Sequence, residues 1–244
     1  MKGVILAGGS GTRLHPLTRI TNKHLLPLYD RPMVTYAVEA LVDAGIGELM
    51  LVTGGTHAGE FFRLLGNGHD YGIERLLYAY QEQAGGIAEA LGLTERFVDG
   101  DKVCVMLADN IFEDSLAPIV ANFAAQAAGA RVVLSRVEED EHLQHLGVAA
   151  MDGDRVTAIV EKPADPPSRF AVTGVYFYDA QVWEVLPTLQ PSGRGELEIT
   201  DVNNWYVERG AMEADVVGGF WGDAGESIDA YYAVNDFVRG KRGG

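Results

Sequence analysis

The chain of 244 residues is 47% hydrophobic and 22% charged, a composition that predicts a large folded core and excludes a disordered chain. Its formal net charge of −16 argues against binding to nucleic acid or to anionic membranes, and no apolar run reaches the roughly 20 residues of a membrane span. The single cysteine, Cys104, excludes an intrachain disulfide, so we expect a buried thiol in a soluble, cytoplasmic protein.

Short apolar runs alternate with amphipathic stretches over the first part of the chain. Because strands and helices take turns, this pattern predicts a three-layer, doubly wound, mostly parallel α/β sheet of the Rossmann-like type. Strands are predicted at 2–7, 48–53, 102–107 and 131–137, and helices at 32–44, 57–65, 87–97 and 115–128.

The second part of the chain predicts a more mixed sheet. No linker, repeat or low-complexity segment divides the sequence, so residues 1–244 are expected to form a single domain. Strands are predicted at 147–151, 155–160 and 172–178, and helices at 180–186, 198–209 and 227–238.

A glycine-rich segment follows the first predicted strand, which includes Leu6. Gly8, Gly9 and Gly11 allow backbone amides to approach phosphate oxygens, and Arg13 after Thr12 can neutralise their charge. The segment is not a Walker loop, because Gly-Lys-Ser/Thr is absent. Taken alone, it also fits a dinucleotide-binding loop or a plain tight turn.

The string from Gly8 to Met33 is more specific. It continues through Pro16-Leu17-Thr18 and Asn22-Lys23-His24-Leu25-Leu26-Pro27, and as a whole it resembles the thymidylyltransferase branch of the sugar-1-phosphate nucleotidylyltransferases. The resemblance extends to about Asp236. It implies the nucleotide-diphospho-sugar transferase fold, with a nucleotide-binding half at about 1–137 and a sugar-phosphate-binding half at about 138–244.

The resemblance implies a set of nucleotide-binding residues. In the segment from Tyr80 to Ala90, Gln81 matches the glutamine that contacts the pyrimidine edge, and Gly86 lets the base lie against the backbone. A glycine-containing entry to a helix is the alternative for this segment. The implied nucleotide-binding residues are Leu6, Gly8, Gly9, Gly11, Thr12, Arg13, Gln81, Gly86 and Asp109.

Two aspartates match the metal ligands of the family. Asp109 follows a predicted central strand, where open α/β sheets bind their ligands, and Asp114 and Ser115 are better placed to cap the next helix. Asp223 lies in the counterpart of the family's Trp-x-Asp-Thr-Gly segment. Magnesium binds one or two carboxylates together with substrate phosphates, so Asp109 and Asp223 are expected to hold Mg²⁺.

The acceptor site is implied by further segments, including Glu161-Lys162-Pro163. By resemblance, Glu161 holds sugar hydroxyls, Lys162 meets the sugar phosphate, and Arg194 is a second phosphate contact. Tyr176 forms a wall of the sugar pocket, while Gly147 and Gly174 make close backbone contacts. The implied sugar-phosphate-binding residues are Gly147, Glu161, Lys162, Val172, Gly174, Tyr176 and Arg194.

Three positions depart from the family pattern. His24 replaces a common glutamine, Leu146 replaces a common aromatic residue, and Ala224 replaces the threonine after the second aspartate. The first change bears on base preference, the second on sugar identity and the third on a hydroxyl near the metal.

The implied enzyme transfers a nucleotidyl group from dTTP to glucose 1-phosphate by Mg²⁺-dependent in-line attack, without a covalent intermediate. Arg13, Lys23, Asp109, Lys162 and Asp223 are its expected catalytic residues. A UTP- or CTP-dependent enzyme for another sugar 1-phosphate, and a non-catalytic nucleotide-sugar sensor, stay open. An NAD-dependent oxidoreductase is disfavoured because the expected acidic residue after a second strand is lacking.

Longer thymidylyltransferases continue with helices that build an oligomer interface and a regulatory nucleotide site. The chain resembles the short form of the family, so no feedback site is expected. Homo-oligomerisation is an expectation of the family alone.

Overall fold

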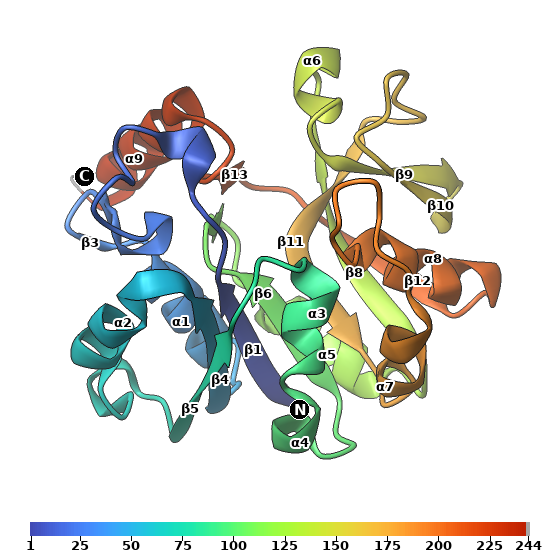
Figure 1. The fold of residues 1–244 in the computed structure, drawn as a ribbon. Helices are drawn as coiled ribbons and strands as arrows, with labels where there is room; N and C mark the ends of the chain where they lie inside the picture. Colours follow the sequence, from blue (N-terminus) through green and yellow to red (C-terminus); the bar gives the residue numbers. More distant parts are fainter. Residues whose placement is uncertain (243–244) are drawn as a thin grey trace.

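The computed structural model describes residues 1–242, which form a central nine-stranded sheet (Figure 1). Its first part is parallel: β1 (Lys2–Ala7) lies between β4 (Glu48–Gly54) and β6 (Val103–Leu107), and β5 (Arg75–Gln81) pairs with β4. Because these strands are parallel, the segments that follow their carboxyl ends emerge at one edge of the sheet.

Strands from later in the chain extend the same sheet. β11 (Phe170–Tyr178) runs antiparallel between β6 and β8 (Ala130–Arg136), and β12 (Met212–Val217) runs parallel to β8. A hairpin of β9 (Gly147–Asp152) and β10 (Arg155–Glu161) pairs with β11 through β9. These pairings give the mixed sheet that the sequence predicts for the second part of the chain.

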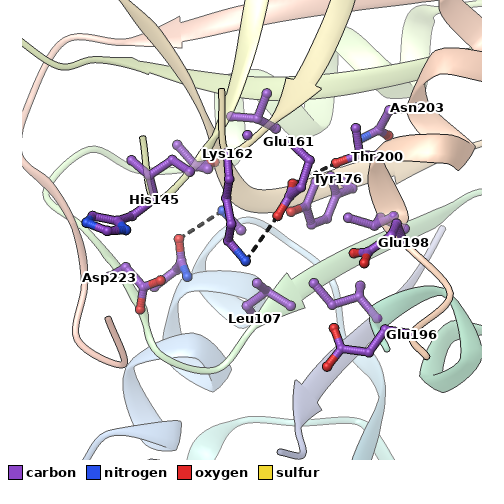
Figure 2. Close-up of a pocket in the computed structure, with 18 of the residues that line it drawn as sticks. Leu107, His145, Glu161, Lys162, Tyr176, Glu196, Glu198, Thr200, Asn203 and Asp223 are labelled. Atoms are coloured by element: carbon purple, nitrogen blue, oxygen red, sulfur yellow. Dashed lines mark hydrogen bonds and ion pairs between the residues drawn. The ribbon is translucent and has the colours of Figure 1, made fainter. Parts of the chain in front are cut away.

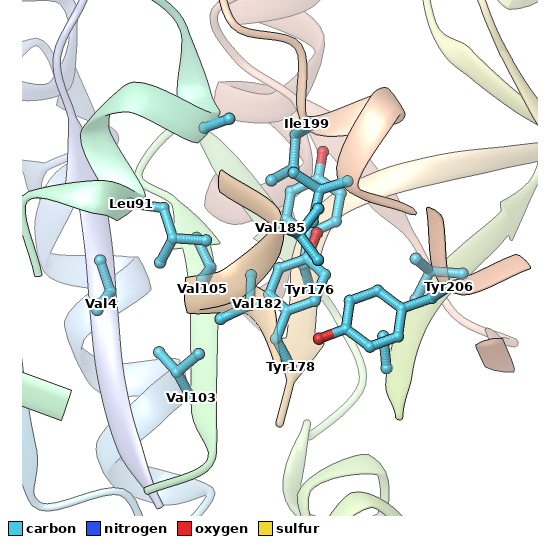
Figure 3. Packing of buried hydrophobic residues seen from close by; sticks show 14 of the residues in the cluster. Val4, Leu91, Val103, Val105, Tyr176, Tyr178, Val182, Val185, Ile199 and Tyr206 are labelled. Carbon is cyan, nitrogen blue, oxygen red and sulfur yellow. The ribbon is translucent and has the colours of Figure 1, made fainter. Parts of the chain in front are cut away.

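Helices cover both faces of the sheet, and alternate side chains along each strand supply two hydrophobic cores. Ile5 and Ala7 of β1 belong to one core, while Val4 and Leu6 belong to the other, part of which is drawn around Val4 in Figure 3. The Ile5 core includes residues of α1 (Val34–Asp43), α2 (Ala58–Leu65) and α5 (Ala117–Ala125). The Val4 core includes residues of α3 (Ile87–Gly92), α4 (Glu95–Val98), α7 (Val182–Val185) and α8 (Ile199–Glu208). This three-layer arrangement confirms the predicted fold class.

A third cluster packs the last helix against the first loops of the chain. Tyr231 and Val234 of α9 (Ile228–Arg242) pack with Leu14 and Ile111, and Tyr231 donates its hydroxyl hydrogen to the carbonyl of Pro27. The short ladder of β2 (Pro27–Leu28) and β3 (Arg31–Pro32) lies beside α9, and a second ladder pairs β7 (Asn110–Phe112) with β13 (Trp221–Asp223). Residues at opposite ends of the sequence therefore meet at one edge of the sheet.

Some predicted elements need correction. The helix expected at 87–97 is two helices, α3 and α4, because the chain turns between Gly92 and Glu95. Asp114 does not cap α5: its carboxylate accepts hydrogen bonds from the backbone N–H groups of Gly218 and Gly219. β5, β7, β12 and β13 were not predicted. Across residues 1–242, no helix is long and apolar enough to cross a membrane.

Candidate functional site

Two adjoining cavities, with volumes of about 250 and 200 Å³, lie at the edge of the sheet where the carboxyl ends of the parallel strands β1 and β6 are. The first is lined by the glycine loop, Lys23, Gln81 and Asp109, and the second by residues of β9, β10, β11 and α8. Both cavities are lined by Arg13, Ile87, Leu107, Glu196 and Asp223. The shared lining makes them two parts of one cleft.

A buried ion pair lies on the floor of the first cavity. Lys23 Nζ is 2.5 Å from Asp109 Oδ2, and the two side chains are 19% and 6% exposed. Asp109 immediately follows β6, whereas Lys23 begins a single turn of 3₁₀ helix, so the contact joins segments 86 residues apart. Asn110 Nδ2 donates to the other carboxylate oxygen of Asp109 at 3.1 Å, which fixes the orientation of that carboxylate.

Asp223 is brought to this pair by the chain pairing of β7 with β13. Asp223 lies opposite Asn110 in that ladder, and the N–H of Ala224 donates to the Asp109 carbonyl at 2.9 Å. Gly225 is required at its position, because a Cβ there would lie 2.2 Å from Asp109 Oδ2 and 2.7 Å from Lys23 Nζ. Two carboxylates predicted from distant segments therefore share one buried environment.

The charges of this cluster shift one another's pKa values. Burial raises the pKa of Asp109, but the Lys23 ammonium and the His24 contact outweigh it and hold that pKa well below its usual range. Burial likewise lowers the pKa of Lys23, and the carboxylates of Asp109 and Asp223 reverse this into a net rise. Burial and repulsion by Asp109 raise the pKa of Asp223. The Lys23 ammonium thus faces two carboxylates, of which Asp109 is the more readily ionised.

The three departures from the family pattern are buried positions. His24 is 2% exposed, with Nδ1 2.9 Å from Asn22 Oδ1 and Nε2 3.8 Å from Asp109 Oδ2, and burial lowers its pKa. Ala224 packs in the cluster under α9, and Leu146 packs with Leu143 and Val148. Their described contacts place His24 beside the Asp109 carboxylate and Leu146 in a small apolar core.

The glycine loop borders the first cavity through Gly8 and Gly9. Gly9 has a φ of 97°, which favours glycine, and Thr18 Oγ1 holds the loop by donating to the Gly11 carbonyl at 2.6 Å. Gly11 and Thr12, although predicted to bind nucleotide, are not among the residues that line either cavity. Arg13 does line both, and it makes no ion pair within residues 1–242.

Gln81 lies at the end of β5 and lines the same cavity. Its Nε2 donates to Glu89 Oε2 at 2.6 Å and to the carbonyl of Gly86 at 3.2 Å. Gly86 has a φ of 102°, and a Cβ there would lie 2.4 Å from the Leu197 carbonyl oxygen. No side chain larger than hydrogen fits this approach of the backbone to Leu197.

The second cavity is lined by Glu161, the last residue of β10, and by Lys162, which follows it (Figure 2). Glu161 Oε2 accepts from Thr200 Oγ1 at 2.9 Å, and Glu161 Oε1 lies 3.4 Å from Lys162 Nζ. Lys162 has a φ of 46°, an uncommon conformation for a residue with a side chain, and its N–H donates to the Leu146 carbonyl at 2.9 Å. The Lys162 ammonium projects into the cavity that Asp223 also lines (Figure 2).

The remaining predicted residues of this half also line the second cavity. Gly174 is required, because a Cβ there would lie 2.6 Å from Asn110 Nδ2, and Tyr176 is 6% exposed, with its pKa raised by burial. Arg194 Nη2 lies 2.9 Å from both carboxylate oxygens of Glu198. Gly147 and Val172 complete the set.

Sequence reasoning missed residues that hold this site together. Asn110 Oδ1 accepts from Gly174 N–H at 2.8 Å and from Trp221 Nε1 at 2.7 Å, and so joins three segments of the site. Thr200 and Glu198 position Glu161 and Arg194. The neighbouring Asp109 was the only signal for Asn110, and Glu198 and Thr200 were visible within the segment 194–201 without an assigned contact.

Comparisons with known proteins agree on the family. The nucleotidyl transferase family profile matches residues 2–241. Over 239 residues, 96% of this chain and 82% of the relative, the chain is 44% identical to a glucose-1-phosphate thymidylyltransferase of Neisseria meningitidis.

Solved structures show the same relationship. A Bacillus anthracis protein, assigned as a glucose-1-phosphate thymidylyltransferase and crystallised with sucrose, superposes with a TM-score of 0.92 at 45% identity, covering 98% of this chain and 95% of that one. A UDP-glucose pyrophosphorylase in complex with UDP-glucose superposes with a TM-score of 0.82 at 26% identity, covering 98% of each chain. The chain belongs to the nucleotidyl transferase family of enzymes.

Proposed function

We propose that the protein transfers the nucleotidyl group of dTTP to glucose 1-phosphate, giving dTDP-glucose and pyrophosphate. The observation that carries this proposal is the meeting of two cavities along a shared wall that includes Arg13 and Asp223, beside the Lys23–Asp109 ion pair. One cavity suits a nucleotide and the other a phosphorylated sugar. Similarity to a named thymidylyltransferase over 96% of the chain supports the choice of substrates.

The nucleoside triphosphate is proposed to bind in the cavity beside the glycine loop. Gly8 and Gly9 admit phosphate oxygens close to the backbone, and Gln81 and Gly86 border the place of the base. In the other cavity, Glu161 accepts hydrogen bonds from sugar hydroxyls while Lys162 and Arg194 bind the sugar phosphate. Thr200 and Glu198 hold two of these side chains in place before the substrate arrives.

The proposed reaction is one in-line displacement. An oxygen of the sugar phosphate forms a bond to the α-phosphorus, and the bond from that phosphorus to the bridging oxygen breaks with its electron pair leaving on pyrophosphate. A phosphate dianion is already a nucleophile, so no protein group has to remove a proton. Arg13, Lys23 and Lys162 reduce the repulsion between the two anions and hold them aligned.

The residues present fit a divalent cation, which we propose to be Mg²⁺. The buried Asp109 carboxylate and the half-buried Asp223 carboxylate form an oxygen donor set beside Lys23, and a cation would offset the repulsion between them, which adds to burial in raising the pKa of Asp223. Within residues 1–242 there is no cluster of three or more candidate side-chain ligands, so phosphate oxygens and water would complete the coordination. Asp109 and Asp223 would hold the ion. When bound, it supplies positive charge to the phosphate oxygens.

The test is pyrophosphate release by purified protein with Mg²⁺, across dTTP, UTP, CTP, ATP and GTP against glucose, galactose, glucosamine and mannose 1-phosphates. We expect dTTP with glucose 1-phosphate to give the highest kcat/KM, and Asp109→Asn to lower kcat by about a hundredfold or more while the protein stays folded. A different best pair would contradict the proposed substrates. No turnover of any pair by folded protein would contradict the proposed reaction.

A further inference from the structure

The amide of Gln81 can point in only one direction. Gln81 is 7% exposed, and its Nε2 has two hydrogen-bond partners, Glu89 Oε2 at 2.6 Å and the Gly86 carbonyl at 3.2 Å. A carboxylate and a carbonyl accept hydrogen bonds and cannot donate them. Turning the amide over would therefore place its oxygen against two other acceptors, so the chemistry of the partners assigns the nitrogen.

Glu89 is itself held in place. It lies on α3, and the same Oε2 atom accepts the N–H of Gly85 at 3.1 Å. A Cβ on Gly85 would lie 2.3 Å from that oxygen, so the glycine is what permits the approach. The loop is fixed in turn by Leu197, whose N–H donates to the Gly85 carbonyl at 2.8 Å. The carboxylate therefore has a defined position independent of any ligand.

The amide oxygen of Gln81 is the atom left for a ligand. It makes no hydrogen bond within residues 1–242, and it lies at the glycine-loop side, 3.0 Å from where a Cβ on Gly8 would be. In this position the Gln81 oxygen accepts a hydrogen bond from a donor on the ligand and repels an acceptor atom of the ligand. Uracil and thymine present an N3–H donor at their pairing edge, whereas N3 of cytosine is an acceptor.

We propose that Glu89 is a positioning residue for base specificity. By holding the Gln81 nitrogen, it turns the Gln81 oxygen toward the base and selects pyrimidines with an N3–H over cytosine. The inference rests on the proposed function, because it needs a nucleoside triphosphate in the cavity that Gln81 lines. It goes further in naming the residue that sets the reading direction and the base that is rejected.

The test compares dUTP with dCTP, which share sugar and phosphates and differ only at C4 and N3 of the base. Binding is measured by titration calorimetry with Mg²⁺ and no sugar phosphate, so that no turnover occurs. We expect wild-type protein to bind dUTP about tenfold more tightly or better, as expected when a buried polar group is left unpaired by the wrong ligand. Glu89→Ala should bring the ratio of the two Kd values close to one.

Two further variants of Glu89, and a control variant elsewhere, separate positioning from folding. Glu89→Gln keeps an oxygen that accepts from Gln81 and Gly85, so it should retain the wild-type ratio. Glu89→Met keeps the length of the side chain but has no such acceptor, so it should bring the ratio of the two Kd values close to one, as Glu89→Ala does. It replaces Glu89→Ala if that variant does not fold. Glu95→Gln on α4 removes an exposed carboxylate that touches none of these groups and should bind as wild type does.

Equal loss of affinity for dUTP and dCTP in the Ala or Met variant would show a structural role only and overturn the proposal. Wild-type protein that binds the two nucleotides equally would also overturn it. Failure of the proposed function has a different signature: no pyrophosphate release with any sugar 1-phosphate, while the preference for dUTP in binding persists.

Discussion

Replacing Lys23 by methionine should destabilise the protein strongly when no divalent cation is present. The substitution keeps most of the volume of the side chain and removes the ammonium that lies 2.5 Å from Asp109. Both side chains are largely buried, and loss of one partner of a buried pair typically costs about 3–5 kcal/mol. At roughly 2–4 °C per kcal/mol for a chain of this size, the melting temperature should fall by about 6–20 °C.

The assay is differential scanning calorimetry in EDTA at pH 7.5, where the Asp109 carboxylate of the wild-type protein is ionised. Lys241→Met is the control, because Lys241 pairs with Glu113 at the surface and such exposed pairs contribute little to stability. In the double variant Lys23→Met/Asp109→Asn no charge of this pair is left unpaired, so it should be more stable than Lys23→Met alone. A Lys23→Met protein as stable as the control, or a double variant no more stable than Lys23→Met, would refute the reasoning.

Three other features of the structure lead to predictions. Gly225→Ala should lower the free energy of unfolding in urea by about 1–3 kcal/mol and reduce turnover, because the new methyl group meets the Lys23–Asp109 ion pair. Gly92→Ala places its methyl group in open space and should leave the unfolding free energy unchanged. The hydrogen bond to Glu226 raises the pKa of His142, so this contact stabilises the protein below about pH 6.5 and stops doing so as the pH rises through the folded pKa. His142→Ala should therefore destabilise the protein more at pH 6 than at pH 8.5, and equal losses of stability at the two pH values would contradict this. Burial raises the pKa of Cys104, so the thiol should react with Ellman's reagent only in urea; rapid reaction of native protein would show that it is accessible.

The sequence predicts the part of the fold that depends on local pattern. The strand Lys2–Ala7 has the predicted bounds, because a continuous apolar run ended by glycines is a strong local signal. β12 was not predicted because its charged residues interrupt the apolar pattern that indicates a strand. In the structure, Glu213 and Asp215 pair with Arg131 of the neighbouring strand β8. Its place in the sheet depends on a partner about 80 residues away.

In the candidate site, too, the sequence predicts some residues, whereas others are found only through contacts between distant segments. Family resemblance named Gln81 and Glu161, and the structure places both at cavity walls. It did not name Glu89 and Thr200, whose hydrogen bonds hold those two side chains. Contacts of this kind need the three-dimensional approach of α3 to β5 and of α8 to β10, and no spacing within the sequence predicts which carboxylate or hydroxyl arrives there.

The central claim is that a sugar-phosphate oxygen attacks the α-phosphorus of dTTP in this cleft. The most direct measurement uses glucose 1-phosphate with ¹⁸O at its non-bridging phosphate oxygens, together with dTTP, Mg²⁺ and the protein, followed by mass spectrometry. The account predicts dTDP-glucose that retains all of the label, and unlabelled pyrophosphate. Label in pyrophosphate, or hydrolysis of dTTP to dTMP with no nucleotide sugar formed, would contradict the claim.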